Sequence, residues 1–300
     1  MGTKFAALGA AALVAGAALS ARAPQIATAP EPALDAAQHL FYSGKYVEAI
    51  AATAPLRQVK ASALGAYELR TSALHFRIKR LLGSAKDKEA AFKQCQSCPD
   101  LLKEFMADAT AGRALAREGL KGAPRDEARL YLLAKLDLNE VWLNNSTLGR
   151  RKGFGLYKDA RREIDGVLAI NPNNLRARVA HAWIDYAVDT RVPFGFKWIL
   201  GGGDRKRALK NMREAAAMKG GHWEEAEADF GLWEMLVAEK MTNDALTVAR
   251  QLIVTFPENE ELQRFVASGG ANLDQSALHS DDPELLGGRR HVDGRRSYDG

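Results

Sequence analysis

The sequence predicts an all-α protein built from antiparallel pairs of helices. Almost no segment alternates apolar and polar residues in the way of a half-buried strand. Apolar residues instead recur with a helical period: Ala180, Trp183, Ile184 and Ala187 fall on one stripe of a helix over residues 174–190. Four segments also place an alanine after a polar turn and then begin an amphipathic helix, at 43–52, 154–174, 203–218 and 241–259. Each stripe needs a partner, so we expect the helices to stack in pairs.

Composition and charge set only broad limits. The chain has 300 residues, 47% of them hydrophobic, which is enough for one large domain or two ordinary ones. The formal net charge of +5 favours solubility and a weak attraction to anionic surfaces. It indicates no specific nucleic-acid partner.

The first 23 residues have the order of a secretory signal peptide. Lys4 precedes an apolar run at 5–19, and a segment of mostly small residues follows at 20–23. The run is shorter than the roughly 20 residues that span a bilayer, so we expect membrane contact only through an uncleaved signal. Residues 24–32 are rich in alanine and proline and are predicted to be a linker. We therefore expect an exported, periplasmic protein.

The predicted helical domain covers residues 33–267. Its first helices are expected at 33–42, 127–145, 175–189 and 223–238, and the four segments above supply the second helices. Three further helical patterns, at 67–82, 86–94 and 99–116, are expected to complete or brace the N-terminal half. Residues 268–300 are rich in Gly, Asp, Arg and Ser without an apolar period, which predicts a disordered tail.

Two of the second helices carry a proline at their predicted end. Ala160 stands twelve residues before Pro172, and Ala245 stands twelve residues before Pro257. Proline lacks the N–H that a continuing helix would use and restricts the residue before it, so both ends are physically marked.

Together with Tyr157, Ile164, Val167, Ala249 and Leu252, this pattern resembles the second helix of the tetratricopeptide repeat, a helix-turn-helix unit of 34 residues. The resemblance is to a degenerate array, with insertions at 146–153 and 190–203. It implies helix pairs stacked into a right-handed superhelix, whose concave groove binds a protein or peptide.

The two cysteines form the motif Cys95-Gln-Ser-Cys98. Haem attachment would need a histidine where Pro99 stands, and a zinc site would need a second pair of ligands. A redox pair normally lies between a strand and a helix, whereas this motif lies between two helical patterns. We predict a structural disulfide, with redox chemistry as the alternative.

His181, Asp185 and Asp189 share one face of a predicted helix. Two interpretations stay open: a cluster that contacts a ligand, and a polar joint whose buried carboxylate is held by a cation. Cationic partners are available at Arg178, Arg191 and the basic helix after Asp204.

The insertion around residues 191–203 has an aromatic part and a glycine part. Phe194, Phe196 and Trp198 are expected either to pack into a groove of the repeats or to form an exposed lip for a protein, peptide or lipid. The three glycines at 201–203 come shortly before a helix, and amides at a helix start attract anions, helped here by the basic side chains at 205–207, of which Arg205 is the candidate ligand-binding residue. Asp204, however, is a good N-cap that would occupy those amides.

No nucleophile and base, metal triad or cofactor fingerprint emerges, so we expect no enzyme and no cofactor. The leading hypothesis is an exported helical-repeat scaffold that mediates protein or peptide interaction. The alternative is a solute- or lipid-binding accessory component of an envelope transport system.

Overall fold

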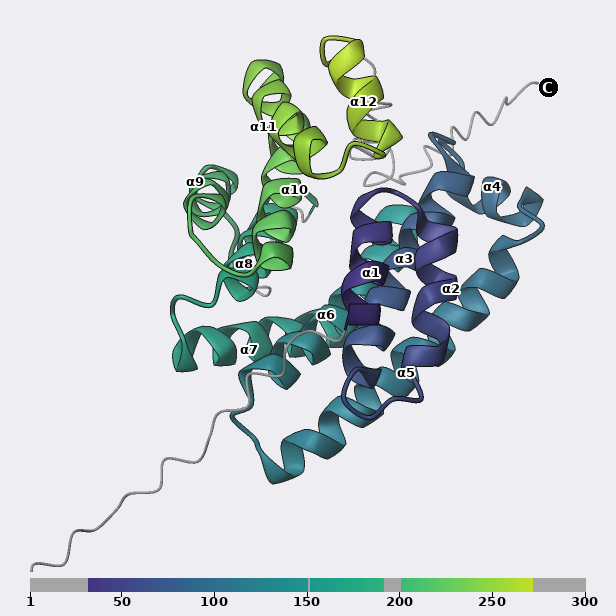
Figure 1. Cartoon of the computed structure of the whole chain (residues 1–300), viewed down its shortest axis with the longest axis vertical. Helices are drawn as coiled ribbons and strands as arrows, with labels where there is room; N and C mark the ends of the chain where they lie inside the picture. The colour runs from purple at the N-terminus through teal and green to yellow at the C-terminus, as the bar shows by residue number, and fades with distance from the viewer. Residues whose placement is uncertain (1–31, 151, 192–200, 272–300) are drawn as a thin grey trace, which may run out of the picture. The chain divides into compact units, whose positions relative to one another are not determined.

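A computed structural model describes residues 32–150, 152–191 and 201–271, all within one compact unit (Figure 1). Over these ranges the chain forms twelve α-helices and no strand, so the all-α prediction is confirmed for them. The predicted signal peptide, almost all of the linker, most of the tail and the aromatic residues Phe194, Phe196 and Trp198 lie outside the described residues.

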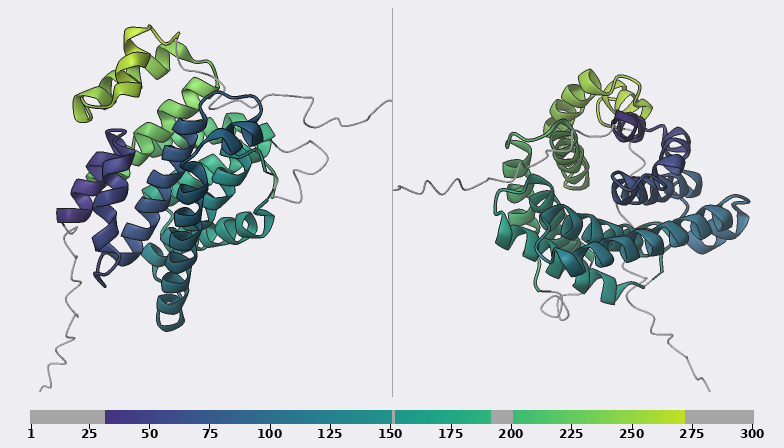
Figure 2. Two further views of the ribbon diagram at one scale, coloured as in Figure 1. Left: turned by 90° about the vertical axis from the view of Figure 1, so that its right-hand side faces the viewer. Right: turned by 60° about the horizontal axis from the view of Figure 1, so that its bottom comes forward.

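Ten of the helices form five packed pairs (Figure 2). The first helices are α1 (Pro32–Tyr42), α3 (Ala63–Leu82), α6 (Glu127–Trp142), α8 (Leu175–Arg191) and α10 (His222–Ala238). Their partners are α2 (Tyr46–Leu56), α5 (Cys98–Gly122), α7 (Phe154–Ile170), α9 (Arg205–Ala216) and α11 (Thr242–Thr255). Each first helix also contacts the first helix of the next pair, so the five of them form a continuous layer.

Two short helices, α4 (Lys88–Gln94) and α12 (Glu260–Ala267), complete the described chain. No sequence pattern above predicts α12. It begins at Asn259, whose Oδ1 accepts hydrogen bonds from the amides of Glu261 at 3.0 Å and Leu262 at 3.1 Å. The sequence holds a helical pattern of apolar residues here, but it is short, because only Leu262 and Phe265 mark the buried face of α12.

Small residues lie where the paired helices touch. Ala160 is fully buried in the apolar cluster that joins α6, α7 and α8, and Ala245 is fully buried in the cluster that joins α8 to α12. A third cluster, around Leu74 and Phe105, joins α3 to α5. Because alanine adds little bulk, the helix axes can approach closely at these points.

The first helix pair contacts the last helices of the chain. The ring of Tyr42 stacks on Trp223, with centroids 5.9 Å apart, and also meets Phe230 and Phe256. Trp223 Nε1 donates to Asp35 Oδ1 at 2.7 Å, and Asn259 Nδ2 donates to the carbonyl oxygen of Tyr42 at 2.8 Å. An ion pair between Lys45 and Glu258 lies beside them. We call this set the closing contact, since it joins the two ends of the helix series.

Different structural constraints favour glycine at positions 201, 202 and 203, which precede α9. Gly201 and Gly202 adopt φ values of 82° and 76°, which favour glycine. A Cβ on Gly203 would lie 2.6 Å from the amide nitrogen of Asp189 and 2.8 Å from the carbonyl oxygen of Asp185. The N-cap prediction for Asp204 is confirmed, because its carboxylate accepts from the Arg207 amide at 3.0 Å. The segment therefore lies close against the end of α8.

Replacing Gly203 with alanine is expected to destabilise the protein by about 1–3 kcal/mol, because the atoms in the way belong to the α8 backbone and cannot rotate aside. The same change at Gly166 of α7 is the matched control: its Cβ would meet nothing within 4 Å, and alanine there is expected to stabilise the helix slightly. Chemical denaturation of both variants measures the two effects. Equal midpoints for the two variants would contradict the steric argument.

Candidate functional site

Four side chains from three first helices meet in one group, which we call the inner polar cluster: Tyr131 and Lys135 of α6, Arg176 of α8 and Glu227 of α10. Glu227 Oε1 accepts hydrogen bonds from Tyr131 Oη and from Lys135 Nζ, both at 2.7 Å. Glu227 Oε2 accepts from Arg176 Nε at 2.8 Å. The Arg176 guanidinium also lies over the Tyr131 ring, 4.6 Å from its centroid. The carboxylate thus links helices that are far apart in sequence.

Local helix geometry places these groups. Tyr131 and Lys135 stand four residues apart on α6, and Asn139 follows after one more turn, so the three side chains share one face. Asn139 Nδ2 donates to the hydroxyls of Thr71 and Ser72 on α3, each at 3.0 Å. These bonds hold the face of α6 against α3.

Lys135, Arg176 and Glu227 of the inner polar cluster are ionised at neutral pH. Burial alone would raise the pKa of Glu227, but the charges and hydrogen bonds of Lys135 and Arg176 outweigh burial and lower that pKa to about 2. Burial likewise disfavours the Lys135 ammonium, yet Glu227 and Glu68 raise its pKa above the ordinary value. The side chains of Lys135 and Arg176 are each 23% exposed, and that of Glu227 is 11% exposed. Solvent therefore reaches a group of fixed charges set deep in the fold.

The remaining first helices contribute neighbours to this cluster. Burial and then the Glu227 charge raise the pKa of Tyr42 on α1 well above its usual value. Glu68 on α3 is buried, and its Oε1 accepts from Ser72 Oγ at 2.9 Å. Burial raises the pKa of Glu234, seven residues after Glu227 on α10. We call the side of the first helices that carries these groups the inner face.

His75 lies on α3 near the same face and is neutral. Burial, followed by the charges of Lys79 and Lys135, lowers its pKa to about 3. Its Nε2 lies 2.8 Å from Thr147 Oγ1, in the π-helical turn Leu143–Thr147 after α6. Its burial and its hydrogen bond to Thr147 fit a packed polar residue that stays neutral near neutral pH.

A second polar group lies between α5, α6 and α7. Arg113 of α5 donates to Asp137 Oδ1 at 3.3 Å and to Glu140 Oε2 at 2.7 Å. Asp137 Oδ2 and Glu163 Oε2 are buried without a hydrogen-bond partner in the described part of the chain. Burial raises the pKa of Asp137 to about 6; burial and then the Asp137 charge raise the pKa of Glu163 to about 8. Two carboxyl groups thus compete for ionisation here.

Replacing Glu163 with glutamine is expected to stabilise the protein at pH 9 by about 1 kcal/mol, with little change at pH 5. Folding raises the pKa of Glu163 from 4.5 to about 8, so the folded protein loses stability as pH rises from the lower value toward the higher one, and the loss is complete above pH 8. Glutamine cannot ionise and removes this loss. Thermal unfolding at both pH values measures it, with Glu118→Gln at an exposed position of α5 as the control. An equal shift at both pH values would contradict the expectation.

The predicted cluster on α8 forms a joint with α7 and α9. Asp185 is 1% exposed, and its Oδ1 accepts from Arg161 Nη2 at 3.0 Å. Its Oδ2 lies 3.5 Å from Arg207 Nη2 and 3.6 Å from His181 Nδ1. Sequence reasoning named the basic helix after Asp204 but missed Arg161, which stands on the facing helix α7. This geometry fits the polar-joint interpretation.

Arg178 and Arg191, the two arginines predicted as partners of Asp185, make other contacts. Asp189 and Arg205, also predicted as site residues, lie at the junction of α8 and α9. Arg178 Nε donates to the carbonyl oxygen of Pro172 at 2.8 Å, and Arg191 donates to Ser146 Oγ. Asp189 Oδ2 accepts from the Arg205 amide at 3.2 Å at the start of α9. Arg205 Nε lies 3.4 Å from Glu239 Oε2. None of these contacts involves the inner polar cluster.

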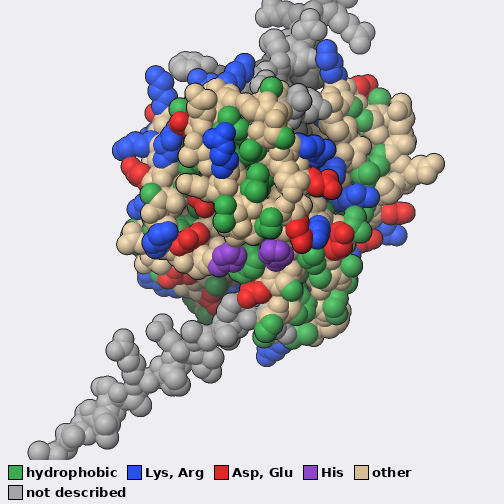
Figure 3. Space-filling view, turned by 45° about the horizontal axis from the view of Figure 1, so that its top comes forward, with side chains coloured by type: hydrophobic (Ala, Val, Ile, Leu, Met, Phe, Trp, Pro, Cys, Tyr) green, Lys and Arg blue, Asp and Glu red, His purple; other side chains and the backbone are tan. Residues whose placement is uncertain are grey.

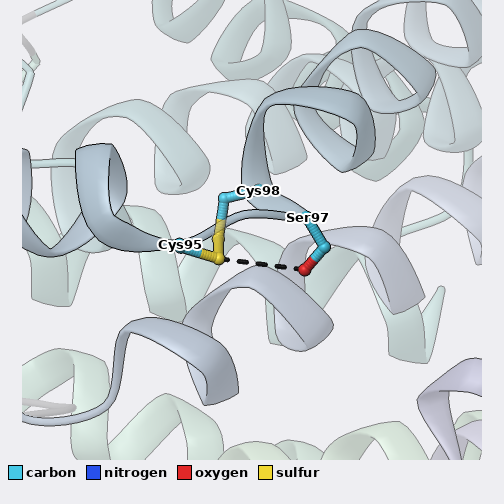
Figure 4. Close-up of a disulfide and its surroundings, with 3 residues drawn as sticks. All are labelled: Cys95, Ser97 and Cys98. Atoms are coloured by element: carbon cyan, nitrogen blue, oxygen red, sulfur yellow. Dashed lines mark hydrogen bonds between the residues drawn. A yellow bond between two sulfur atoms is a disulfide. The ribbon is translucent and has the colours of Figure 1, made fainter.

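Cys95 and Cys98 form a disulfide at the junction of α4 and α5 (Figure 4). Cys98 is fully buried, and both residues belong to the apolar cluster around Leu74 and Phe105. A half-cystine packed among apolar side chains at a helix start serves to orient the helix. Such a position favours the structural role over redox chemistry.

The double variant Cys95→Ala, Cys98→Ala is expected to lose about 1–2 kcal/mol of stability, since the loop that the bond closes is very short. Thermal melts with and without a reductant measure the effect. Reduction should lower the melting temperature of the wild type and leave that of the variant unchanged. A wild type that melts at the same temperature in both conditions would contradict the structural role.

Other site types find no support in the described ranges. Within them, no three histidine, cysteine or acidic side chains are placed to hold a metal ion. None of the helices described there has the length and apolar character needed to cross a bilayer.

No protein-family model matches the chain, and no curated protein matches it in sequence.

Proposed function

We propose that this is a non-enzymatic binding protein of the helical-repeat type, which holds a small solute on the inner face of its first helices. The observation that carries the proposal is the inner polar cluster. Its two cations and one carboxylate come from three helices and are partly exposed, at 11–23%. Replacing such charges by apolar residues is often neutral or stabilising, so stability alone is a weak reason for them.

The closing contact supports a small solute over an extended partner. A peptide or folded protein lying along the whole inner face would have to reach past the junction of α1 with α10 and α11, where Tyr42 meets Trp223 and Phe256. A solute of a few non-hydrogen atoms would not need to separate these rings. The solute-binding alternative from the sequence is therefore our first proposal.

Interaction with a protein is the second proposal, supported by exposed apolar side chains on the second helices of the pairs. Val254 of α11 is 83% exposed and Phe154 of α7 is 54% exposed. On the face seen in Figure 3, basic, acidic and apolar side chains are interspersed. We also propose that the repeats are of the tetratricopeptide type and that the protein is exported; the disulfide supports export because such bonds persist in oxidising compartments.

Native mass spectrometry of protein purified from its own host tests the two functions. A bound solute appears as a mass above that of the chain, which disappears under denaturing conditions. Affinity capture from the envelope fraction is the second arm, with a Phe194→Ser, Phe196→Ser, Trp198→Ser variant beside the wild type. The bare chain mass together with a stable protein partner would reject the first proposal. Equal capture of the partner by the wild type and by the variant would show that the aromatic insertion does not bind that partner.

A further inference from the structure

We propose that Lys135 and Arg176 bind an oxyanion group of the solute, of the carboxylate or phosphate kind. This inference rests on the proposed solute-binding function and specifies the chemistry of its ligand. It comes from the hydrogen-bond donors that the inner polar cluster leaves unused.

Arg176 uses only part of its donor capacity. In the described part of the chain, its hydrogen bonding is confined to Nε, which donates to Glu227, while Nη1 and Nη2 meet no acceptor. Lys135 likewise makes one hydrogen bond, also to Glu227, although an ammonium carries three donors. The two cations are therefore neighbours with spare N–H groups, and both are open to solvent over 23% of their side chains.

The buried arginines of the described chain, Arg70 and Arg113, donate from both terminal nitrogens. Arg70 donates from Nε to Asp108 at 2.7 Å, from Nη1 to the carbonyl oxygen of Ile50 and from Nη2 to Glu104. Arg113 divides its terminal nitrogens between Asp137 and Glu140. Arg176 differs because its free edge carries both terminal amino groups, and two such groups side by side suit the two oxygens of a carboxylate or phosphate.

The surroundings hold the guanidinium in place before any ligand arrives. Arg176 lies over the Tyr131 ring, and Tyr131 Oη donates to the same carboxylate that binds Arg176. Little side-chain freedom remains to be lost on binding, which favours affinity. Acidic neighbours set a limit to the charge of the site, because Glu227 and Glu68 both act on Lys135 and Arg176. We therefore expect recognition through directed hydrogen bonds more than through a strong positive field.

Isothermal titration calorimetry at low ionic strength tests the site, with sodium succinate and sodium phosphate as separate probes. Wild-type protein is expected to bind at least one of them, and the stronger probe distinguishes a carboxylate from a phosphate ligand. Arg176→Gln is expected to weaken that binding by about 10- to 100-fold. Glu227→Gln is expected to tighten it by about threefold or more, because a negative charge beside both cations is removed.

Arg213→Gln is the matched control. Arg213 is an exposed arginine of α9 that pairs with Asp244 away from the cluster, so its loss should leave binding unchanged. The proposal is overturned if the wild type binds neither probe, or if Arg176→Gln and Glu227→Gln bind as the wild type does. The wild-type titration decides even where a variant folds poorly. A solute retained in native mass spectra but insensitive to Arg176→Gln would reject the oxyanion site and leave the solute-binding function standing.

Discussion

Replacing Phe256 with alanine is expected to cost about 3–5 kcal/mol and to release the first helix pair from the last helices. Phe256 is 1% exposed and lies at the centre of the closing contact. Its ring centroid is 5.6 Å from Tyr42 and 5.8 Å from His39 on α1, and 5.5 Å from Phe230 on α10. Truncation removes the buried ring and leaves a cavity that rigid helices cannot fill.

The effect has a local signature that separates it from general destabilisation. Hydrogen exchange should speed up first in α1 and in its partner α2, because His39 and Tyr42 of α1 contact this ring and α2 packs on α1. Val254→Ala is the control: it lies two residues away and is 83% exposed, so its cost should stay within about 0.5 kcal/mol. If exchange in residues 32–56 is unchanged in Phe256→Ala, the closing contact does not hold the first pair.

Replacing Glu227 with alanine is expected to cost about 2–4 kcal/mol, because Lys135 and Arg176 then lose the carboxylate that both of them bind. The figure is set below that of a fully buried pair, since these cations are each 23% exposed and solvent compensates in part. Tyr131 Oη loses its acceptor as well. Glu227→Gln keeps an acceptor oxygen in the same place and should cost clearly less.

The acid dependence of stability provides an independent measurement. The folded pKa of Glu227 is about 2, below the unfolded value, so its contribution is present above the unfolded pKa and is lost as pH falls toward 2. Wild type should therefore lose stability between about pH 5 and 2 more steeply than Glu227→Gln. Chemical denaturation across that range compares the two. Parallel curves would show that Glu227 is not held as an ionised partner in the folded state.

The helices themselves follow from the local sequence. Predicted first helices at 33–42, 175–189 and 223–238 match α1, α8 and α10 to within about two residues, which is the usual uncertainty of a helix end. Ala160 and Ala245 were expected between packed helices, and both are fully buried. These predictions succeed because periodicity, caps and prolines act over a few residues of chain. The sequence pattern does not predict α12, because eight residues hold too few turns to show a helical period.

The site could not be predicted in the same way. Glu227 and Tyr131 are hydrogen-bonded across 96 positions of sequence, and a lysine or glutamate on a helix is ordinarily a solvent-facing residue. The helical period places Asp185 on a polar face of one helix, but its partner Arg161 stands 24 positions away on α7. A single helix identifies a polar face without identifying the face opposite.

The sequence by itself determined that this chain forms paired amphipathic helices, with small residues at their contacts and Asp204 as a cap, because each of these properties depends on neighbours within a few turns. Only the tertiary structure decided that α1 meets α10 and α11 around Phe256, and that Lys135 and Arg176 share one carboxylate. A helical period shows which residues lie on the same face of a helix. The packing angles between successive helices add up along the five pairs, and their sum decides which distant helices each helix face meets.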